Sequence, residues 1–403
     1  MTREEVYIEC LTKLEKSDFL LLELATGMGK SKQAIDIINY LVETKYQGKH
    51  TSMLLLVAKT VHKQTWKDEF KKWGGINVDE LTIECFESLK KHEYESFDFV
   101  VMDECHHLHS DKRLDLFSTL TYGNVIGLSA TIPKKLRQYF QYEYAAEVVT
   151  CSIVDAIEDE VLPEPQIILY PLQLDNIRPT ESIEVNPKAK GKTYYGNYNE
   201  LWKYRKMKVH AIISCTPRQR VNEYNSQILY EKNRYMRTRQ DFLKNIWLFD
   251  CGERIKYLAN LKNNIVLSIL QRLEKERTIT FCKTIEQADI LGKYSIHSKN
   301  KDSDIIYNSF NAKKINHIVS VNVLNEGANL VDCKYAVFAN YSSSEICSAQ
   351  RVGRSLRHKS PVIILPYYEA TREEEIVNTM IESFKEESIH TIHSLKELDK
   401  FIQ

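Results

Sequence analysis

The sequence has no long apolar run, no paired cysteine motif and no excess of one charge. Its longest apolar segments, Phe19–Leu24 and Met53–Ala58, have the length of strands and are too short to span a bilayer. The N-terminal residues are polar and acidic and lack the basic and apolar regions of a secretory signal. Nine dispersed cysteines, none in a C-x-x-C arrangement, argue against a disulfide framework or a zinc module. We therefore expect reduced thiols, no membrane partner, and a location in the cytoplasm, or in the host cytoplasm for a viral protein.

The charges balance over the whole chain but not along it. The 403 residues include 55 Lys and Arg and 55 Asp and Glu, whereas Val185–Lys262 alone has 17 basic and six acidic residues. This segment carries a surplus of +11, and the remainder of the chain carries −11. The separation matters more than the total, because a basic segment attracts polyanions.

Short apolar runs alternate with charged, helix-permissive segments towards both ends of the chain. In the first 150 residues the runs are Phe19–Leu24, Met53–Ala58, Phe97–Met102 and Val125–Leu128. The same rhythm returns in Thr278–Phe281, His317–Val321, Ala336–Phe338 and Val362–Leu365. Strands that are buried on both faces read as continuous apolar runs, so this pattern predicts parallel sheets with crossover helices.

The predicted fold class is therefore α/β, with two domains flanking a basic insertion. We expect the first domain at 1–175, the insertion at 176–260, and the second domain, with C-terminal helices, at 261–403. The insertion lacks the alternation of the flanking domains. Asn197–Val209 and Arg220–Ile246 read as helices, with a break at Cys215–Arg218.

A glycine-containing loop follows the first predicted strand. Residues 25–31 read Ala-Thr-Gly-Met-Gly-Lys-Ser and precede the helical stretch Lys32–Leu41. Glycines let backbone N–H groups curl around phosphates, and a helix N-terminus adds its positive dipole end. Lys30 is expected to bridge the β- and γ-phosphates of ATP, and Ser31 to bind Mg²⁺. The predicted nucleotide-binding residues of this loop are Thr26, Gly27, Met28, Gly29, Lys30 and Ser31.

An acidic pair follows the buried run Phe97–Met102. A metal ligand and a water-activating base are needed at such a strand end, one crossover unit beyond a phosphate loop. Asp103 is predicted to hold the metal, and Glu104 to orient or deprotonate the attacking water. The alternative is a strand end with surface acids. His106 and His107 lack the spacing and the further ligands of a zinc site.

Hydrolysis of ATP also needs a cation against the γ-phosphoryl group. Arg354 and Arg357 lie one turn apart if Ala349–Leu356 begins a helix, so both can project from one face. If they belong to the second domain, ATP is expected to bind between the two domains. The alternative is a pair of surface arginines in salt bridges.

Seven segments resemble the motifs of superfamily 2 helicases, in the DExH branch and in family order across residues 19–358. They are residues 25–31 (motif I), 57–60 (Ia), 103–106 (II), 129–131 (III), 278–284 (IV), 322–330 (V) and 350–357 (VI). The resemblance implies two RecA-like domains that use ATP and Mg²⁺ and couple hydrolysis to movement along nucleic acid or to its unwinding.

The resemblance also implies roles for residues outside the phosphate loop. It implies nucleic-acid contacts for Lys59, Thr60 and Thr284, and coupling roles for Ser129 and Thr131. The implied nucleotide ligands and catalytic residues in the second half of the chain are Gly327, Asn329, Gln350, Arg354 and Arg357.

The basic segment combines its charge with twelve aromatic residues. Cations contact phosphates and aromatic faces stack on bases, which are the two ingredients of single-strand binding. Two groups of cations could line a nucleic-acid path: Lys203, Arg205, Lys206 and Lys208, or Arg234, Arg237 and Arg239. We assign the predicted contacts to the second group. The alternative is a helical subdomain whose aromatic residues pack inward and whose basic face is solvated.

Three positions depart from the family pattern. Leu24 stands where the strict phosphate-loop pattern has its first glycine, and Thr2–Leu14 lacks the adenine-reading glutamine, a role in which Arg3 could share. Asn329 replaces a common aspartate, as in some DNA translocases and restriction-enzyme motors. The sequence thus predicts a monomeric ATP-dependent DNA helicase or translocase. The alternatives are an RNA helicase and a nucleic-acid-dependent ATPase clamp or remodelling subunit without strand separation.

Overall fold

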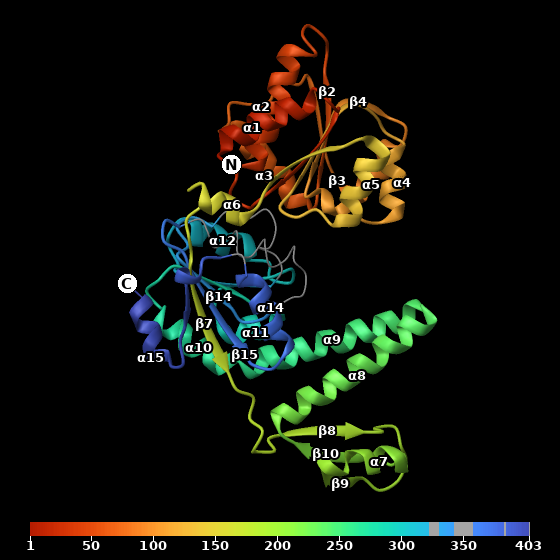
Figure 1. Cartoon of the computed structure of the whole chain (residues 1–403), viewed down its shortest axis with the longest axis vertical. Helices are drawn as coiled ribbons and strands as arrows, with labels where there is room; N and C mark the ends of the chain where they lie inside the picture. Colours follow the sequence, from red (N-terminus) through yellow and green to blue (C-terminus); the bar gives the residue numbers. More distant parts are fainter. Residues whose placement is uncertain (322–329, 342–357, 383, 403) are drawn as a thin grey trace.

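The computed structural model describes residues 1–321, 330–341, 358–382 and 384–402 (Figure 1). These residues form two α/β domains and an insertion that projects from the second domain. Within this described part, no helix is both long and apolar enough to cross a membrane.

The first domain contains a six-stranded parallel sheet in the order β3-β2-β4-β5-β1-β6. The strands are β1 (Phe19–Leu24), β2 (Ser52–Val57), β3 (Glu80–Cys85), β4 (Ser96–Asp103), β5 (Thr121–Ser129) and β6 (Glu147–Cys151). The helices are α1 (Arg3–Leu14), α2 (Lys30–Thr44), α3 (Thr60–Lys72), α4 (Asp111–Ser118) and α5 (Lys134–Tyr144).

Burial of both sheet faces explains the apolar runs in this domain. Along β1, Leu20 and Leu22 pack in the cluster that includes α1, α2 and α3, whereas Phe19 and Leu21 pack in the cluster that includes α4 and α5. Successive strand residues point to opposite faces, so a strand between two helical layers needs an apolar residue at nearly every position.

The second domain contains a seven-stranded parallel sheet in the order β12-β13-β11-β14-β15-β7-β16. The strands are β7 (Gln166–Leu172), β11 (Thr278–Phe281), β12 (Ser295–Ile296), β13 (His317–Ser320), β14 (Tyr335–Phe338), β15 (Val362–Tyr368) and β16 (Ile389–Thr391). Its helices are α10 (Asn263–Arg272), α11 (Ile285–Leu291), α12 (Ser303–Asn311), α14 (Arg372–Ile381) and α15 (Leu395–Leu398).

Strand β7 belongs to the second sheet, although its residues lie within the predicted first domain, 1–175. After α6 (Ile153–Glu158), the chain enters the second sheet and pairs with β15 over seven registered residues, from Val362↔Gln166 to Tyr368↔Leu172. The predicted boundary at residue 175 therefore does not coincide with the division between the sheets. The apolar run Ile167–Leu169 gains neighbours on both sides, β15 and β16.

The insertion is less helical than the sequence pattern predicts. It contains a three-stranded sheet in the order β8-β10-β9, formed by Glu181–Val185, Ala211–Cys215 and Tyr194–Asn197, with α7 (Leu201–Met207) packed against it. The apolar pattern does not indicate these strands, because each has only four or five residues and none is a continuous buried run.

The rest of the insertion is a helical hairpin of α8 (Pro217–Thr238) and α9 (Asp241–Leu261) (Figure 1). Thr216 caps α8 by accepting a hydrogen bond from Gln219 N, and Pro217 occupies its first turn, which explains the predicted break at this point. The single helix predicted over Arg220–Ile246 is wrong, because Arg239 ends α8 in a left-handed conformation with φ of 56°.

Candidate nucleotide site and its surroundings

The loop after β1 has the backbone geometry of a phosphate cradle. Ala25 N donates to Cys151 O at 2.8 Å, and Met28 N donates to Ala25 O at 3.2 Å, which turns the chain tightly. Gly27 and Gly29 have φ of 103° and 84°, in the left-handed region that favours glycine. The helix α2 then begins with no side-chain cap at Gly29. Its first-turn N–H groups and positive dipole end are therefore suited to an anionic group such as a phosphate.

Each residue predicted for this loop belongs to one strand–loop–helix unit. Lys30 is the first residue of α2, and its Nζ donates to Leu24 O at 3.0 Å, so the amine lies along the loop. Thr26 is buried, and Ser31 is partly buried one residue further into the helix. The loop thus accepts leucine in place of the first glycine of the strict pattern, since Leu24 is the buried last residue of β1.

Three contacts that the sequence did not predict support the phosphate loop. A Cβ atom at Gly27 would lie 2.8 Å from Leu162 Cδ2, so the glycine permits close packing of Leu162. Arg3 Nη2 donates to Gly27 O at 3.0 Å, and Gln33 Nε2 donates to Arg3 O at 2.7 Å. Leu162 lies between α6 and β7, so the linker to the second domain contacts the phosphate loop. Neither Gln33 nor Leu162 carries a recognisable local signal.

The acidic pair lies at the end of β4, beside the strand that carries Ser129. Asp103 Oδ2 accepts a hydrogen bond from Trp66 Nε1 at 2.9 Å. Glu104 is buried and left-handed, with φ of 56°. His106 Nδ1 lies 3.0 Å from Ser129 Oγ and 3.4 Å from a Glu104 oxygen. Because β5 lies between β4 and β1 in the sheet, it brings the acidic pair next to the phosphate loop.

The Ser129 hydroxyl lies within hydrogen-bonding distance of the Glu104 carboxylate. Its hydroxyl lies 3.4 Å from Glu104 Oε2 and 2.8 Å from Thr131 O, while Thr131 N donates to Ser129 Oγ at 3.2 Å. A hydroxyl has a single proton, so Ser129 can donate to only one of these acceptors at a time. The coupling role of Ser129 and Thr131 stays a prediction.

Glu23 fixes the loop that follows Ser129. Its Oε1 accepts from Ile132 N at 2.7 Å, and its carboxylate pairs with Arg137 of α5. The sequence carries a signal for this role, because Glu23 is the one charged residue in the apolar run of β1. A charge on an otherwise buried strand needs a partner, and here the partners position the loop.

The predicted nucleic-acid contacts lie in three separate places. Lys59 and Thr60 are exposed at the start of α3, directly after β2. Thr284 caps α11 by accepting from Gln287 N at 3.1 Å, so its hydroxyl already has a structural role. Arg234, Arg237 and Arg239 lie at the end of α8, near the tip of the hairpin.

The three hairpin arginines are not equivalent. Arg234 Nη1 donates to both carboxylate oxygens of Glu231, at 2.9 and 3.0 Å. Arg239 lies over the Tyr235 ring, with its guanidinium carbon 5.7 Å from the ring centroid. Among the residues described, Arg237 and Arg239 form no ion pair, so they are the more available of the three.

The remaining predicted site residues lie outside the described part of the chain. They are Gly327 and Asn329 of motif V, and Gln350, Arg354 and Arg357 of motif VI.

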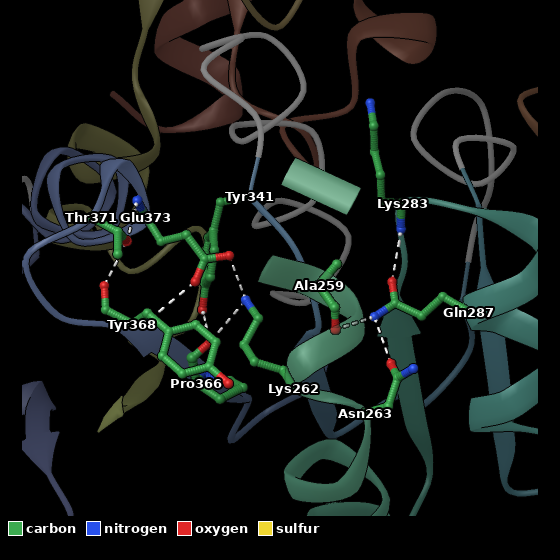
Figure 2. Close-up of polar contacts among 10 residues, drawn as sticks. All are labelled: Ala259, Lys262, Asn263, Lys283, Gln287, Tyr341, Pro366, Tyr368, Thr371 and Glu373. Atoms are coloured by element: carbon green, nitrogen blue, oxygen red, sulfur yellow. Dashed lines mark hydrogen bonds and ion pairs between the residues drawn. The ribbon is translucent and has the colours of Figure 1, made fainter. Parts of the chain in front are cut away.

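A buried ion pair joins the base of the hairpin to α14 of the second domain (Figure 2). Lys262, between α9 and α10, has no exposed surface, and its Nζ donates to Glu373 Oε1 at 2.6 Å. The same ammonium lies 3.4 Å from Pro366 O and 4.7 Å from the Tyr341 ring centroid. Burial lowers the pKa of Lys262, and the Glu373 carboxylate opposes that shift. The other Glu373 oxygen accepts from Tyr368 N at 3.1 Å.

A second buried side chain, that of Gln287, links the base of the hairpin by hydrogen bonds to the motif IV segment, residues 278–284. Gln287 is fully buried, and its Nε2 donates to Ala259 O at 2.9 Å and to Asn263 Oδ1 at 3.0 Å (Figure 2). Its Oε1 accepts from Lys283 N at 3.2 Å. The start of α11 and the junction of α9 with α10 are therefore fixed to each other by hydrogen bonds.

Replacing Lys262 with methionine should destabilise the second domain by about 3–5 kcal/mol, because Glu373 would remain buried without a cation. The free energy of unfolding in urea measures this loss. Lys256→Met, an exposed lysine of α9, should change that free energy by no more than about 0.5 kcal/mol. Adding Glu373→Gln to Lys262→Met should recover part of the loss. A Lys262→Met variant as stable as the wild type would refute a structural role for the pair.

Comparison with known proteins finds similarities to helicases. Residues 261–359 match the helicase conserved C-terminal domain. A candidate ATP-dependent RNA helicase of African swine fever virus, QP509L, is 29% identical over 27% of this chain and 24% of its own length. The chain thus spans about a quarter of the viral relative that it matches.

Two solved structures share the fold across the chain. An S. cerevisiae Dbp5 variant bound to RNA and ADP BeF3 is 12% identical, with a TM-score of 0.59 over 99% of this chain and 92% of that one. The Type ISP restriction-modification enzyme LlaBIII bound to DNA is 13% identical, with a TM-score of 0.56 over 100% of this chain and 32% of that one. The shared fold and the two parallel sheets confirm the predicted α/β class with two RecA-like domains.

Proposed function

We propose that this chain is a superfamily 2 helicase that hydrolyses ATP to move along nucleic acid or unwind it; its fold and its match to the helicase conserved C-terminal domain support this proposal. One observation carries the proposal. The phosphate loop, the pair Asp103 and Glu104, and Ser129 lie at the ends of β1, β4 and β5, which are adjacent in one sheet. Phosphoryl transfer needs these groups together, because its catalysis consists of positioning and of neutralising charge.

The residues at this site fit ATP and Mg²⁺. Backbone N–H groups around Gly27 and Gly29 would hold the phosphates, and Lys30 would neutralise their charge. Ser31 and Asp103 would hold Mg²⁺, which when bound neutralises the phosphate oxygens. Glu104 would orient the attacking water and accept its proton, with its carboxylate kept in place by the buried cluster around Ser129 and His106.

The proposal assigns the second domain a role in the same reaction. Gln350, Arg354 and Arg357 would stabilise the charge that develops during hydrolysis, and Gly327 and Asn329 would contact the nucleotide. The contact between Leu162 and Gly27 supports the coupling of the two domains, since Leu162 lies on the segment that leads into β7 of the second sheet. A shift of the phosphate loop would move this linker.

DNA is the proposed track and RNA is the alternative. Asn329, which resembles the residue of some DNA translocases, favours DNA, and LlaBIII is named as bound to DNA. The viral relative is named for RNA, and Dbp5 is named as bound to RNA. The polymer that stimulates ATP hydrolysis will decide between them.

Steady-state ATP hydrolysis should be measured without polymer and then with single-stranded DNA, duplex DNA and single-stranded RNA. Strong stimulation by one of these polymers supports the proposal and identifies the track. Hydrolysis that no polymer changes would contradict it. A helicase or translocase should also displace a strand or clear a bound roadblock, whereas an ATPase clamp would do neither.

Neutralising the hairpin arginines should weaken nucleic-acid binding and flatten its salt dependence, because a protein that contacts fewer phosphates releases fewer counterions on binding. For a single strand, the double substitution Arg237→Gln and Arg239→Gln should reduce the magnitude of the negative slope by about 1.4, when the logarithm of the association constant is plotted against the logarithm of the salt concentration. Arg234→Gln alone should change it little, since Glu231 already pairs with Arg234.

The matched control is Lys396→Gln with Lys400→Gln, two exposed lysines near the C-terminus. Equal salt slopes for the wild type, the hairpin pair and this control would show that the hairpin arginines do not contact phosphates. The slope is obtained from fluorescence anisotropy titrations of a labelled oligonucleotide at several salt concentrations.

A further inference from the structure

Residues 181–215, here called the small module, form a folded unit of their own within the insertion. Strand β10 pairs antiparallel with β8 and parallel with β9. The unit has a separate apolar cluster, made of Ile183, Val185, Leu201, Tyr204, Ala211, Ile213 and Cys215. Figure 1 shows it beyond the start of α8, away from both large sheets. Binding of a ligand to this unit can therefore be tested separately from ATP hydrolysis.

The structure divides the aromatic residues of the small module into two groups. Tyr204 is buried, its ring lies 5.9 Å from the Tyr194 ring, and its hydroxyl donates to Tyr195 O at 3.3 Å. Tyr195 and Trp202, in contrast, each expose 73% of their surface. The inward-packing alternative thus holds for Tyr204 but not for Tyr195 or Trp202. Large rings exposed to this extent contribute little to folding and are suited to stacking on a ligand.

The cations of the small module are likewise divided. Arg205 pairs with Glu223 of α8, and Lys203 lies 3.5 Å from Glu200. Five other lysines are exposed and form no ion pair with any residue that the structure describes: Lys188, Lys190, Lys192, Lys206 and Lys208. Lys206 lies one turn after Trp202 on α7, so the two side chains share a face of the helix.

Exposed rings beside unpaired lysines fit a particular kind of ligand. Lysines attract a phosphate backbone, and aromatic faces stack on bases that are not already stacked in a duplex. We propose that the small module is a second binding site for single-stranded nucleic acid, in which Trp202 and Tyr195 stack on bases and the five lysines contact phosphates. The choice of nucleic acid as the anion rests on the proposed function.

Tryptophan fluorescence of the full chain tests this site directly, because base stacking quenches an indole. The chain has four tryptophans. Trp66 is buried, Trp73 is 37% exposed, and Trp247 is partly buried with its ring 6.0 Å from the Tyr235 ring, so Trp202 is the most accessible of the four to a base. Titration with oligothymidylate or oligouridylate, without ATP, should quench the fluorescence. The quenching should disappear in Trp202→Phe and persist in Trp73→Phe.

Affinity provides the second measurement. Trp202→Ala should weaken oligonucleotide binding roughly tenfold, with an unchanged circular dichroism spectrum and thermal midpoint. Quenching that survives in Trp202→Phe, or equal quenching by duplex and single strands, would overturn the proposal. So would quenching by polyglutamate but not by oligonucleotides, since that result would identify an acidic protein as the ligand.

This test can fail independently of the proposed function. Lys30→Ala should lose ATP hydrolysis and keep the quenching. Polymer-stimulated hydrolysis without quenching of Trp202 would overturn the small-module site and leave the motor standing. Quenching without stimulated hydrolysis would support the site and contradict the motor.

Discussion

Replacing Lys30 with alanine should reduce ATP hydrolysis roughly 10²- to 10³-fold, the loss typical of removing one group that stabilises developing charge. Lys30 is the first residue of α2, and its amine lies against Leu24 O at the base of the phosphate loop. Without Lys30, the phosphates would still accept hydrogen bonds from the backbone N–H groups of the loop, but no lysine cation would lie beside them. Polymer-stimulated turnover at saturating ATP is the measurement.

The matched control for this substitution is Lys32→Ala. Lys32 lies two residues further along α2 and pairs with Asp36 on the helix surface. A half-exposed pair of this kind contributes little, so hydrolysis should remain within about twofold of the wild type. If Lys30→Ala retained most of the wild-type turnover while Lys32→Ala did the same, the loop would not be the phosphate-binding site.

Replacing Glu104 with glutamine should leave ATP binding intact and slow hydrolysis by roughly 10²- to 10⁴-fold, the usual contribution of a positioned general base. The amide has nearly the shape of the carboxylate and can still accept a hydrogen bond from Ser129, but it cannot take a proton from water. Single-turnover hydrolysis measures the chemical step, and a fluorescent ATP analogue measures binding.

Glu87→Gln is the matched control for Glu104→Gln. Glu87 is exposed and pairs with Arg113 at 2.8 Å. Its replacement should change neither binding nor hydrolysis by more than about twofold. A normal hydrolysis rate in Glu104→Gln would exclude Glu104 as the base. Lost ATP binding would instead indicate that Glu104 acts through the nucleotide or the fold.

The catalytic half of the first domain could be predicted from the sequence because each of its parts is local. Gly27 and Gly29 are required by positive φ angles within one short loop, and Lys30 begins the helix that follows directly. The acids of motif II follow a strand whose apolar run is visible in the sequence. Since parallel strands end at the same edge of a sheet, these local signals also predict that the groups lie together.

The contacts that support the site could not be predicted, because they join residues far apart in the chain. Leu162 packs on Gly27, Arg3 bonds to Gly27 O, and Glu23 holds the loop after Ser129. Of these residues only Glu23, a charge within an apolar strand, signals that it needs a partner, and the sequence does not identify that partner. Lys262 and Glu373 likewise form a buried pair although they lie 111 residues apart in the chain.

The sequence by itself determined the two parallel sheets, the phosphate loop and the acidic pair, since strand burial and backbone turns leave their mark on neighbouring residues. Only the tertiary structure decided that β7 joins the second sheet and that part of the insertion is a small sheet. The tertiary structure also decided that the Tyr204 side chain is buried and that the Trp202 side chain is exposed. Short strands and single aromatic residues carry weak local signals, and their place is set by the partners with which they can bury surface or pair in a sheet.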